Sequence, residues 1–202
     1  MKKIILASAS PRRRALLEAL GIDFEVRVAD IEECDAGTLP AGIVEANAER
    51  KCRAVGNVVE EDALIIAADT LVFLDEAVLS KPISLDDARE MLRQLSGNTH
   101  QVITGIAILD NAANRMVTGA ESTDVTFRPL SETEIKRFVD TVRPLDRAGA
   151  YTVDGPGSLL VSRYDGCYQN VLGLPIVRLD KLLRTIGYSL FELMHPEKTR
   201  FL

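Results

Sequence analysis

The first stretch that could do chemistry is LASASPRR, residues 6–13. An apolar run ends there, small hydroxyl residues turn the chain, and a predicted helix begins with Arg12 and Arg13 in its first turn. A helix N-terminus offers backbone N–H groups and a positive dipole end, and arginine donates paired hydrogen bonds to phosphate oxygens. The pattern favours a phosphate-binding site. The alternative is a solvated basic helix start, although cations at that end oppose the helix dipole.

A second stretch, LIIAADT at residues 64–70, places a carboxylate after a buried apolar run. Asp69 is expected at the end of a strand, where α/β sheets usually bind their ligands. A carboxylate there can orient water and accept its proton. The alternative is that Asp69 only caps a turn. A third candidate, Lys81 before Pro82, follows a predicted hairpin, and a lone lysine of this kind is usually solvated.

Several other kinds of catalytic site are disfavoured. Neither His100 nor His195 has the nearby acid and nucleophile of a hydrolytic triad, and no Gly-rich Walker loop or dinucleotide fingerprint is present. Cys34, Cys52 and Cys167 are odd in number and widely spaced, which fits buried thiols better than disulfides or zinc ligands. Catalysis would therefore depend on carboxylates, lysines, arginines and a metal ion.

Composition narrows the class of protein further. The 202 residues are 47% hydrophobic and 27% charged, typical of one globular domain or of two lobes sharing a core. A net charge of −6 and only ten aromatic residues, with no run in which basic and aromatic residues alternate, disfavour stable nucleic-acid binding. No apolar run suits a signal peptide or a membrane span, so we expect a cytoplasmic protein without membrane association.

Apolar runs alternate with helical patterns along the chain, which predicts an α/β fold. Helix starts are signalled by Ser10 before Pro11, by Ser84 with Asp87, and by Ser131. Residues 71–74 and 77–79 are expected to form a hairpin. The tail beyond Gly187 has no evident packing partner, although Phe191, Leu193 and Met194 could pack as one short helical turn. Strands are expected at about 3–7, 24–28, 63–68, 101–109, 116–127 and 159–162, and helices at about 11–20, 41–55, 85–95, 132–139 and 175–186.

Seven segments, in order and with matching spacing up to about residue 186, resemble the Maf family of nucleotide pyrophosphatases. They are LASASPRR, AADT at 67–70, Lys81-Pro82, LSGNTHQVITG at 95–105, TDVTFRPLSETEI at 123–135, PLDRAGAY at 144–151 and NVLGLP at 170–175. The resemblance implies an α/β fold with a mixed twisted sheet, flanking helices and two lobes around a deep cleft, as in Maf and ITPase proteins. Residues 1–202 would form one such domain, with a short extension from about residue 188.

The same resemblance implies a reaction. It is the cleavage of a nucleoside triphosphate between the α- and β-phosphates with Mg²⁺ or Mn²⁺, by a protein that forms a homodimer. We add the hypothesis that carboxylates ligate the metal directly, since hard cations prefer oxygen ligands. The residues implied are Ser8, Arg12 and Arg13 for phosphate, Asp69 as general base, Glu33, Lys51 and Lys81 as further catalytic residues, and Glu33 and Asp69 as the hypothesised metal ligands.

Three positions separate the branches of the family. Arg12 and Thr70 match the branch that acts on dTTP and UTP, whereas Asp154 stands where that branch has Gln. An Asp carboxylate only accepts hydrogen bonds, so its contact with a base edge would differ from that of a Gln amide. Two further departures are Ala67, where Gly is usual, and Arg50, where Glu commonly precedes the lysine.

The expected function is therefore a house-cleaning pyrophosphatase for nucleotides such as dTTP and UTP. One alternative is a pyrophosphatase for modified nucleotides such as 7-methyl-GTP. Another is a nucleotide-binding regulator of cell division and septum formation, in which turnover would be incidental. The retained set of Asp69, Lys51, Lys81 and Glu33 favours the enzyme, because a pure binding module does not need a base.

Overall fold

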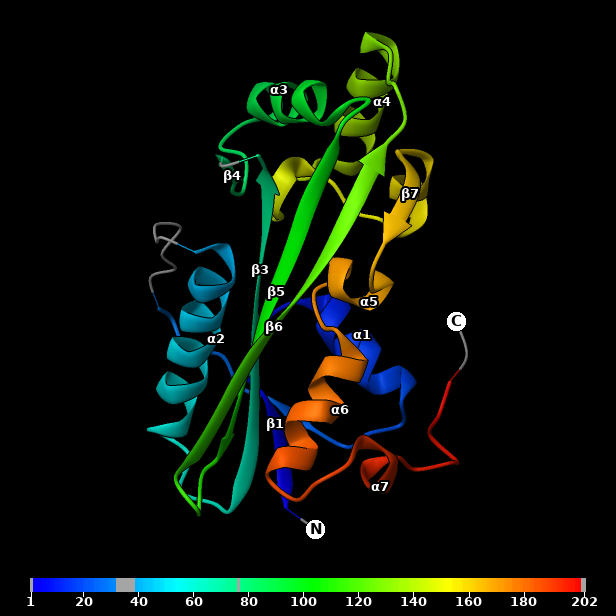
Figure 1. Ribbon diagram of the computed structural model, residues 1–202. Helices are drawn as coiled ribbons and strands as arrows, with labels where there is room; N and C mark the ends of the chain where they lie inside the picture. The colour runs from blue at the N-terminus through cyan, green and yellow to red at the C-terminus, as the bar shows by residue number, and fades with distance from the viewer. Residues whose placement is uncertain (1, 32–38, 76, 201–202) are drawn as a thin grey trace. The chain divides into compact units, whose positions relative to one another are not determined.

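The computed structural model describes residues 2–31, 39–75 and 77–200 (Figure 1). The chain divides into two compact units. The first contains Met1–Asp69, Thr104–Glu121 and Gly173–Leu202, and the second contains Thr70–Ile103 and Ser122–Leu172. Within the described ranges, no helix is both long and apolar enough to cross a membrane.

A seven-stranded mixed sheet confirms the predicted fold class. Its order is β2-β1-β3-β5-β6-β7, with β4 paired to β3. The β1 strand is parallel to β2 and β3, whereas β3–β4 and β6–β7 are antiparallel. The strands are β1 (Lys3–Leu6), β2 (Glu25–Val26), β3 (Ala63–Leu74), β4 (Ala77–Leu79), β5 (Thr99–Asp110), β6 (Arg115–Phe127) and β7 (Val161–Asp165).

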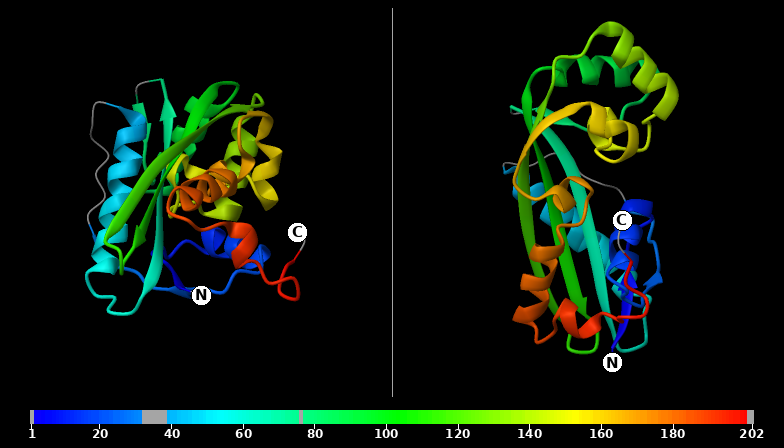
Figure 2. Two further views of the ribbon diagram at one scale, coloured as in Figure 1. Left: turned by 60° about the horizontal axis from the view of Figure 1, so that its bottom comes forward. Right: turned by 90° about the vertical axis from the view of Figure 1, so that its right-hand side faces the viewer.

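Helices cover both faces of the sheet in the first unit. Helix α2 (Pro40–Gly56) lies on one face, and α1 (Pro11–Ala19) and α6 (Ile176–Thr185) lie on the other (Figures 1 and 2). Side chains alternate between the faces along each strand. The row that packs with α2 is Ile5, Ala63, Ile65, Ala67, Ala107 and Leu109. The row that packs with α1 and α6 is Ile4, Leu6, Leu64, Ile66, Ala68, Ile106 and Ile108.

The second unit has its own core, built from the other ends of the long strands and two amphipathic helices. Helix α3 (Leu85–Leu95) begins with Ser84 accepting from the Asp87 backbone, and α4 (Glu132–Val142) begins with a complete capping box of Ser131 and Glu134. Both helix starts were predicted from these residues. The unit also contains η1 (Ala148–Ala150), η2 (Gly155–Leu159) and α5 (Tyr168–Val171).

Three predicted strands were wrong in extent. The third strand does not end at residue 68 but continues to Leu74, because its backbone stays paired beyond the apolar run. The second strand is only Glu25–Val26. The last strand starts at Val161, since residues before it form η2.

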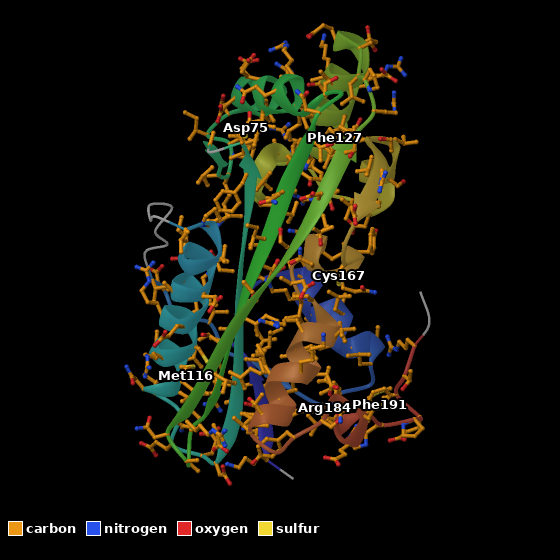
Figure 3. The ribbon with its side chains drawn as sticks, viewed as in Figure 1. Asp75, Met116, Phe127, Cys167, Arg184 and Phe191 are labelled. Carbon is orange, nitrogen blue, oxygen red and sulfur yellow. The ribbon has the colours of Figure 1, made fainter. Side chains whose placement is uncertain are left out.

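The C-terminal segment also differs from the prediction. Helix α7 (Leu190–Leu193) forms, and its Leu190 and Leu193 side chains are buried in the core of the first unit. Phe191, labelled in Figure 3, was expected to pack but is 75% exposed. The helix turn places residues 190 and 193 on one face, and residue 191 therefore points away from it.

Candidate active site

The Asp69 carboxylate lies on the face of β3 that α2 covers. Residues 63, 65 and 67 face α2, and the alternation of a strand gives residue 69 the same direction. Asp69 therefore lies inside a continuous strand rather than at its end, which corrects the sequence prediction and excludes a turn cap. Only 4% of the residue is exposed, so a charge there needs close partners.

Helix α2 supplies those partners from two residues one turn apart. The Lys51 ammonium lies 2.5 Å from Asp69 Oδ1, and Asn47 Nδ2 donates to Asp69 Oδ2 over 2.8 Å. Residues separated by four positions share one helix face. Each carboxylate oxygen therefore accepts at least one N–H hydrogen bond, which satisfies the buried group.

A glycine on β5 lets α2 approach the sheet closely enough for these contacts. A Cβ atom built on Gly105 would lie 2.3 Å from the Val44 carbonyl carbon and 2.5 Å from the Glu45 nitrogen. Both are backbone atoms of the helical turn that precedes Asn47, so they could move away only if the whole helix moved. The glycine that ends the LSGNTHQVITG motif is thus explained by backbone packing.

A second polar group forms where β1 joins α1. Arg13 Nη1 donates to Ser8 Oγ over 3.0 Å, and its Nε donates to the Gly173 carbonyl over 2.8 Å. Arg13 is only 9% exposed, so the alternative of a solvated basic helix start is wrong for this residue. It holds for Arg14, which is exposed and pairs with Glu18. Ser10 occupies the N-cap position of α1, but its side chain makes no capping bond.

Register relates the two polar groups within the first unit. Leu6 pairs with Ile66 in parallel, and the Ala7 amide donates to the Ile66 carbonyl. Ser8 therefore follows the end of β1 by two residues, and Asp69 follows the paired position of β3 by three. Both lie beyond the carboxyl end of β1, the end at which open α/β sheets bind ligands.

The other predicted site residues occupy different parts of the chain. Arg12 is half-buried in the first turn of α1. Thr70, Lys81 and Asp154 belong to the second unit, where Thr70 is half-buried on β3 and Lys81 is exposed after β4. Asp154 is exposed before η2, and its carboxylate accepts from the Thr152 hydroxyl. Glu33, like Cys34, lies outside the described residues.

Sequence reasoning missed Asn47. A signal was present, because Asn47 and Lys51 are four residues apart in a predicted helix that otherwise buries apolar side chains. The orientation of Arg50, left open by the sequence, is now defined by its hydrogen bond to Asn47 Oδ1.

Asp69 is the described carboxylate of this site that could ligate a divalent cation. No group of three or more histidine, cysteine, aspartate or glutamate side chains in the described ranges forms a metal cluster. A carboxylate has about four acceptor positions. Two of those of Asp69 are used by N–H donors, so the carboxylate can still coordinate one metal ion. The site therefore fits a cation with few protein ligands, as is usual for Mg²⁺.

Comparisons with known proteins extend over almost the whole chain. The model of the family described as Maf-like protein matches residues 3–186. A dTTP/UTP pyrophosphatase of Pelotomaculum thermopropionicum is 47% identical over 190 residues, 94% of this chain and 99% of that protein. One of Caldicellulosiruptor bescii is 43% identical over 199 residues, 95% of this chain and 98% of that protein.

Among solved structures, a HAM1 protein from Coxiella burnetii is 18% identical with a TM-score of 0.45. The match covers 63% of this chain and 73% of that one. The family match and the sequence identities show that this chain belongs to the Maf-like protein family.

Proposed function

We propose that the protein is a nucleoside triphosphate pyrophosphatase that converts dTTP and UTP to the monophosphate and pyrophosphate. The single observation that carries this proposal is the Asp69 carboxylate, buried in β3 and held on both oxygens by α2. Family membership and two relatives named dTTP/UTP pyrophosphatase, at 47% and 43% identity, support the substrate class.

In this proposal Asp69 is the general base. Water attacks the α-phosphorus, and the carboxylate orients that water and accepts its proton as the bond to the β-phosphate oxygen breaks. Pyrophosphate leaves with the electrons of that bond. Lys51, 2.5 Å from Asp69 Oδ1, stabilises negative charge close to the reacting atoms.

Arg13 and Ser8 are the proposed phosphate-binding groups of the first unit. Arg13 is held by the Gly173 carbonyl, so its planar guanidinium is already oriented before substrate binds. An oriented donor loses less conformational freedom on binding than a solvated side chain does. This arrangement explains why a cation is tolerated in the first turn of α1, where it opposes the helix dipole.

A divalent cation, Mg²⁺ or Mn²⁺, is the proposed cofactor. When bound, it would neutralise the charge that collects on the phosphate oxygens. Asp69 is the described residue proposed to ligate it. The role assigned to Glu33 as a second ligand lies outside the described residues and stays a prediction.

The biological role proposed is removal of particular nucleotides before they enter nucleic acids. That role fits a protein located in the cytoplasm. The family resemblance also implies that the protein forms a homodimer. Both remain predictions. Sedimentation of the purified protein at several concentrations would measure the oligomeric state directly.

The deciding experiment measures pyrophosphate and monophosphate released from dTTP, UTP, CTP and 7-methyl-GTP with Mg²⁺ or Mn²⁺. Asp69→Asn is expected to lower kcat by about 100-fold or more, since it removes the base and keeps the shape of the side chain. Asp75→Asn is the matched control, because Asp75 is exposed in the turn that follows the same strand (Figure 3).

Three outcomes would contradict the proposal in different ways. Nucleotide binding without turnover would favour the regulatory alternative. Turnover that is unchanged in Asp69→Asn would remove Asp69 as the base. Preference for 7-methyl-GTP would show that Asp154, in place of Gln, moves this chain to another substrate.

A further inference from the structure

Asn47 is a polar side chain in a helix face that otherwise buries apolar residues. It is fully buried on α2, between Val44 and Ala48, and its Nδ2 atom donates to Asp69 Oδ2 over 2.8 Å. A buried amide costs free energy unless it is hydrogen-bonded. Its position against Asp69 therefore needs an explanation other than core packing.

The orientation of the Asn47 amide is defined at both ends. Its Oδ1 atom accepts from Arg50 Nη2, and its Nδ2 atom donates to a carboxylate oxygen, which is an acceptor. Rotating the amide by half a turn would place Oδ1 against Asp69 and Nδ2 against a guanidinium, with repulsion at both contacts. The amide therefore has one stable orientation, as a donor to Asp69.

Two donors on opposite oxygens restrict the carboxylate more than one donor does. Rotation about the Cβ–Cγ bond of aspartate has a broad energy profile, so a single partner leaves the carboxylate plane poorly defined. Lys51 has a long flexible stem, whereas the amide of Asn47 is only two bonds from the helix backbone. The short side chain is the one able to define the plane.

We infer that Asn47 is a positioning residue, anchored by Arg50, which holds the Asp69 carboxylate in the orientation needed to accept a proton from water. The inference rests on the proposed function, since it assigns Asp69 as the base. It adds a hydrogen-bonded row of Arg50, Asn47 and Asp69 that reaches from the exposed side of α2 to the reacting group.

The first test compares Asn47→Leu and Asn47→Asp with wild type. Leu keeps similar volume without a donor, and kcat is expected to fall about 10- to 100-fold while KM changes by less than about twofold. Asp keeps the shape but turns an acceptor toward Asp69, so its loss of kcat is expected to be the larger. A purely structural role would lower the thermal midpoint and leave kcat per folded molecule unchanged.

The anchor is tested separately on the same helix. Arg50→Met removes the hydrogen bond to Asn47 Oδ1 but keeps the donor to Asp69, and a smaller drop in kcat is expected. Arg53→Met is the matched control, because Arg53 is exposed and pairs with Glu49. Equal effects of the two arginine variants would overturn the role of Arg50 as an anchor.

A readout independent of turnover keeps this inference separable from the proposed function. In ¹⁵N-labelled protein, the Asn47 side-chain amide signals, assigned by their loss in Asn47→Leu, should exchange more slowly than those of exposed Asn114. They should also shift in Asp69→Asn. An inactive wild type with these signatures would refute the enzyme and retain the Asn47–Asp69 bond. Exchange as fast as that of Asn114, or unchanged kcat in Asn47→Leu, would overturn the inference.

Discussion

Asp69 in the first unit and His100 in the second are both titratable side chains buried on strands, at 4% and 2% exposure. Their surroundings differ. Asp69 has N–H donors on both oxygens, one of them from a cation. His100 lies edge-on to the rings of Phe127 and Tyr151, and one hydrogen bond of 2.7 Å joins its Nε2 atom and the Tyr151 hydroxyl.

The difference shows two ways to bury an ionisable group. The charge of Asp69 is compensated by N–H donors on both oxygens, which offsets the cost of burying it. The aromatic surroundings offer no compensation to an imidazolium, and burial lowers the pKa of His100 to about 4. His100 therefore stays neutral and contributes packing and one hydrogen bond, whereas the charge of Asp69 is held by donors from the helix that covers it.

The largest expected effect is removal of the cation from the Asp69 cluster. Lys51→Met keeps much of the side-chain volume and leaves a buried carboxylate with a neutral donor only. We expect the free energy of unfolding to fall by about 3–5 kcal/mol, since breaking a buried pair leaves an uncompensated charge. Urea unfolding at pH 7 would measure it.

The control for Lys51→Met is the double variant Lys51→Met/Asp69→Asn. With no charge left to compensate, much of the lost stability should return while activity stays absent. If Lys51→Met alone were as stable as wild type, the compensation argument for this cluster would be wrong.

The second prediction uses acid to alter the His100 cluster. Because the pKa of His100 falls from its ordinary 6.5 to about 4 in the folded state, the unfolded chain binds more protons between these values. Stability is therefore fully present above pH 6.5 and is lost as the pH falls toward 4, by about 3 kcal/mol in total. Unfolding free energies measured from pH 7 to 4 would show the slope.

The matched variant for that experiment is His100→Phe, which fills the aromatic site without a titratable ring. The pH dependence of wild type minus that of the variant isolates the histidine contribution from the carboxylates that also titrate in acid. A difference that stays constant with pH would show that the second unit does not bury a neutral imidazole at a cost to its protonated form.

Local sequence signals predicted where the helices begin. The ends of the strands were predicted wrongly, because they depend on pairing with residues distant in sequence. Ser84 and Ser131 define helix starts within four residues of sequence, and both caps formed as expected. Asp69 and Thr70, in contrast, read as the end of a strand because they are polar. Whether β3 continues depends on pairing with strands distant in sequence, which no local pattern records.

The site was partly predictable for the same reason. Asp69 and Arg13 stood out because each residue type is unusual at its local position. Asn47 is unremarkable until α2 is placed over the row of β3 that includes residue 69. The displaced start of β7 has a similar cause, since Gly157 is so close to the Thr152 carbonyl oxygen that a Cβ would lie 1.7 Å from it. The η2 helix that contains Gly157 extends to Leu159, the first residue of the predicted strand, and so delays the start of β7.

The smallest expected change in stability tests how the donors of the Asp69 cluster are placed. Gly105→Ala would put a Cβ atom 2.3 Å from the Val44 carbonyl carbon, so α2 must move away from the sheet. Overpacking of this kind costs about 1–3 kcal/mol. Asn47 and Lys51 move with the helix, away from Asp69. The kcat per folded molecule should therefore fall, which the modest loss of stability alone would not cause.

Gly119→Ala on β6 is the matched control for the Gly105 variant. Its Cβ would lie 3.0 Å from the Arg178 guanidinium, the far end of a flexible side chain that can shift at little cost. The two variants add the same methyl group to strands of the same sheet, and only Gly105→Ala moves the donors of Asp69. Measuring kcat and the free energy of unfolding in urea for both variants would show whether the loss of activity is specific to Gly105→Ala. Equal loss of kcat in both variants would mean that activity does not depend on the close approach of α2 to the sheet. The Asp69 cluster would then not differ from the His100 site in its dependence on donors that a packed helix supplies.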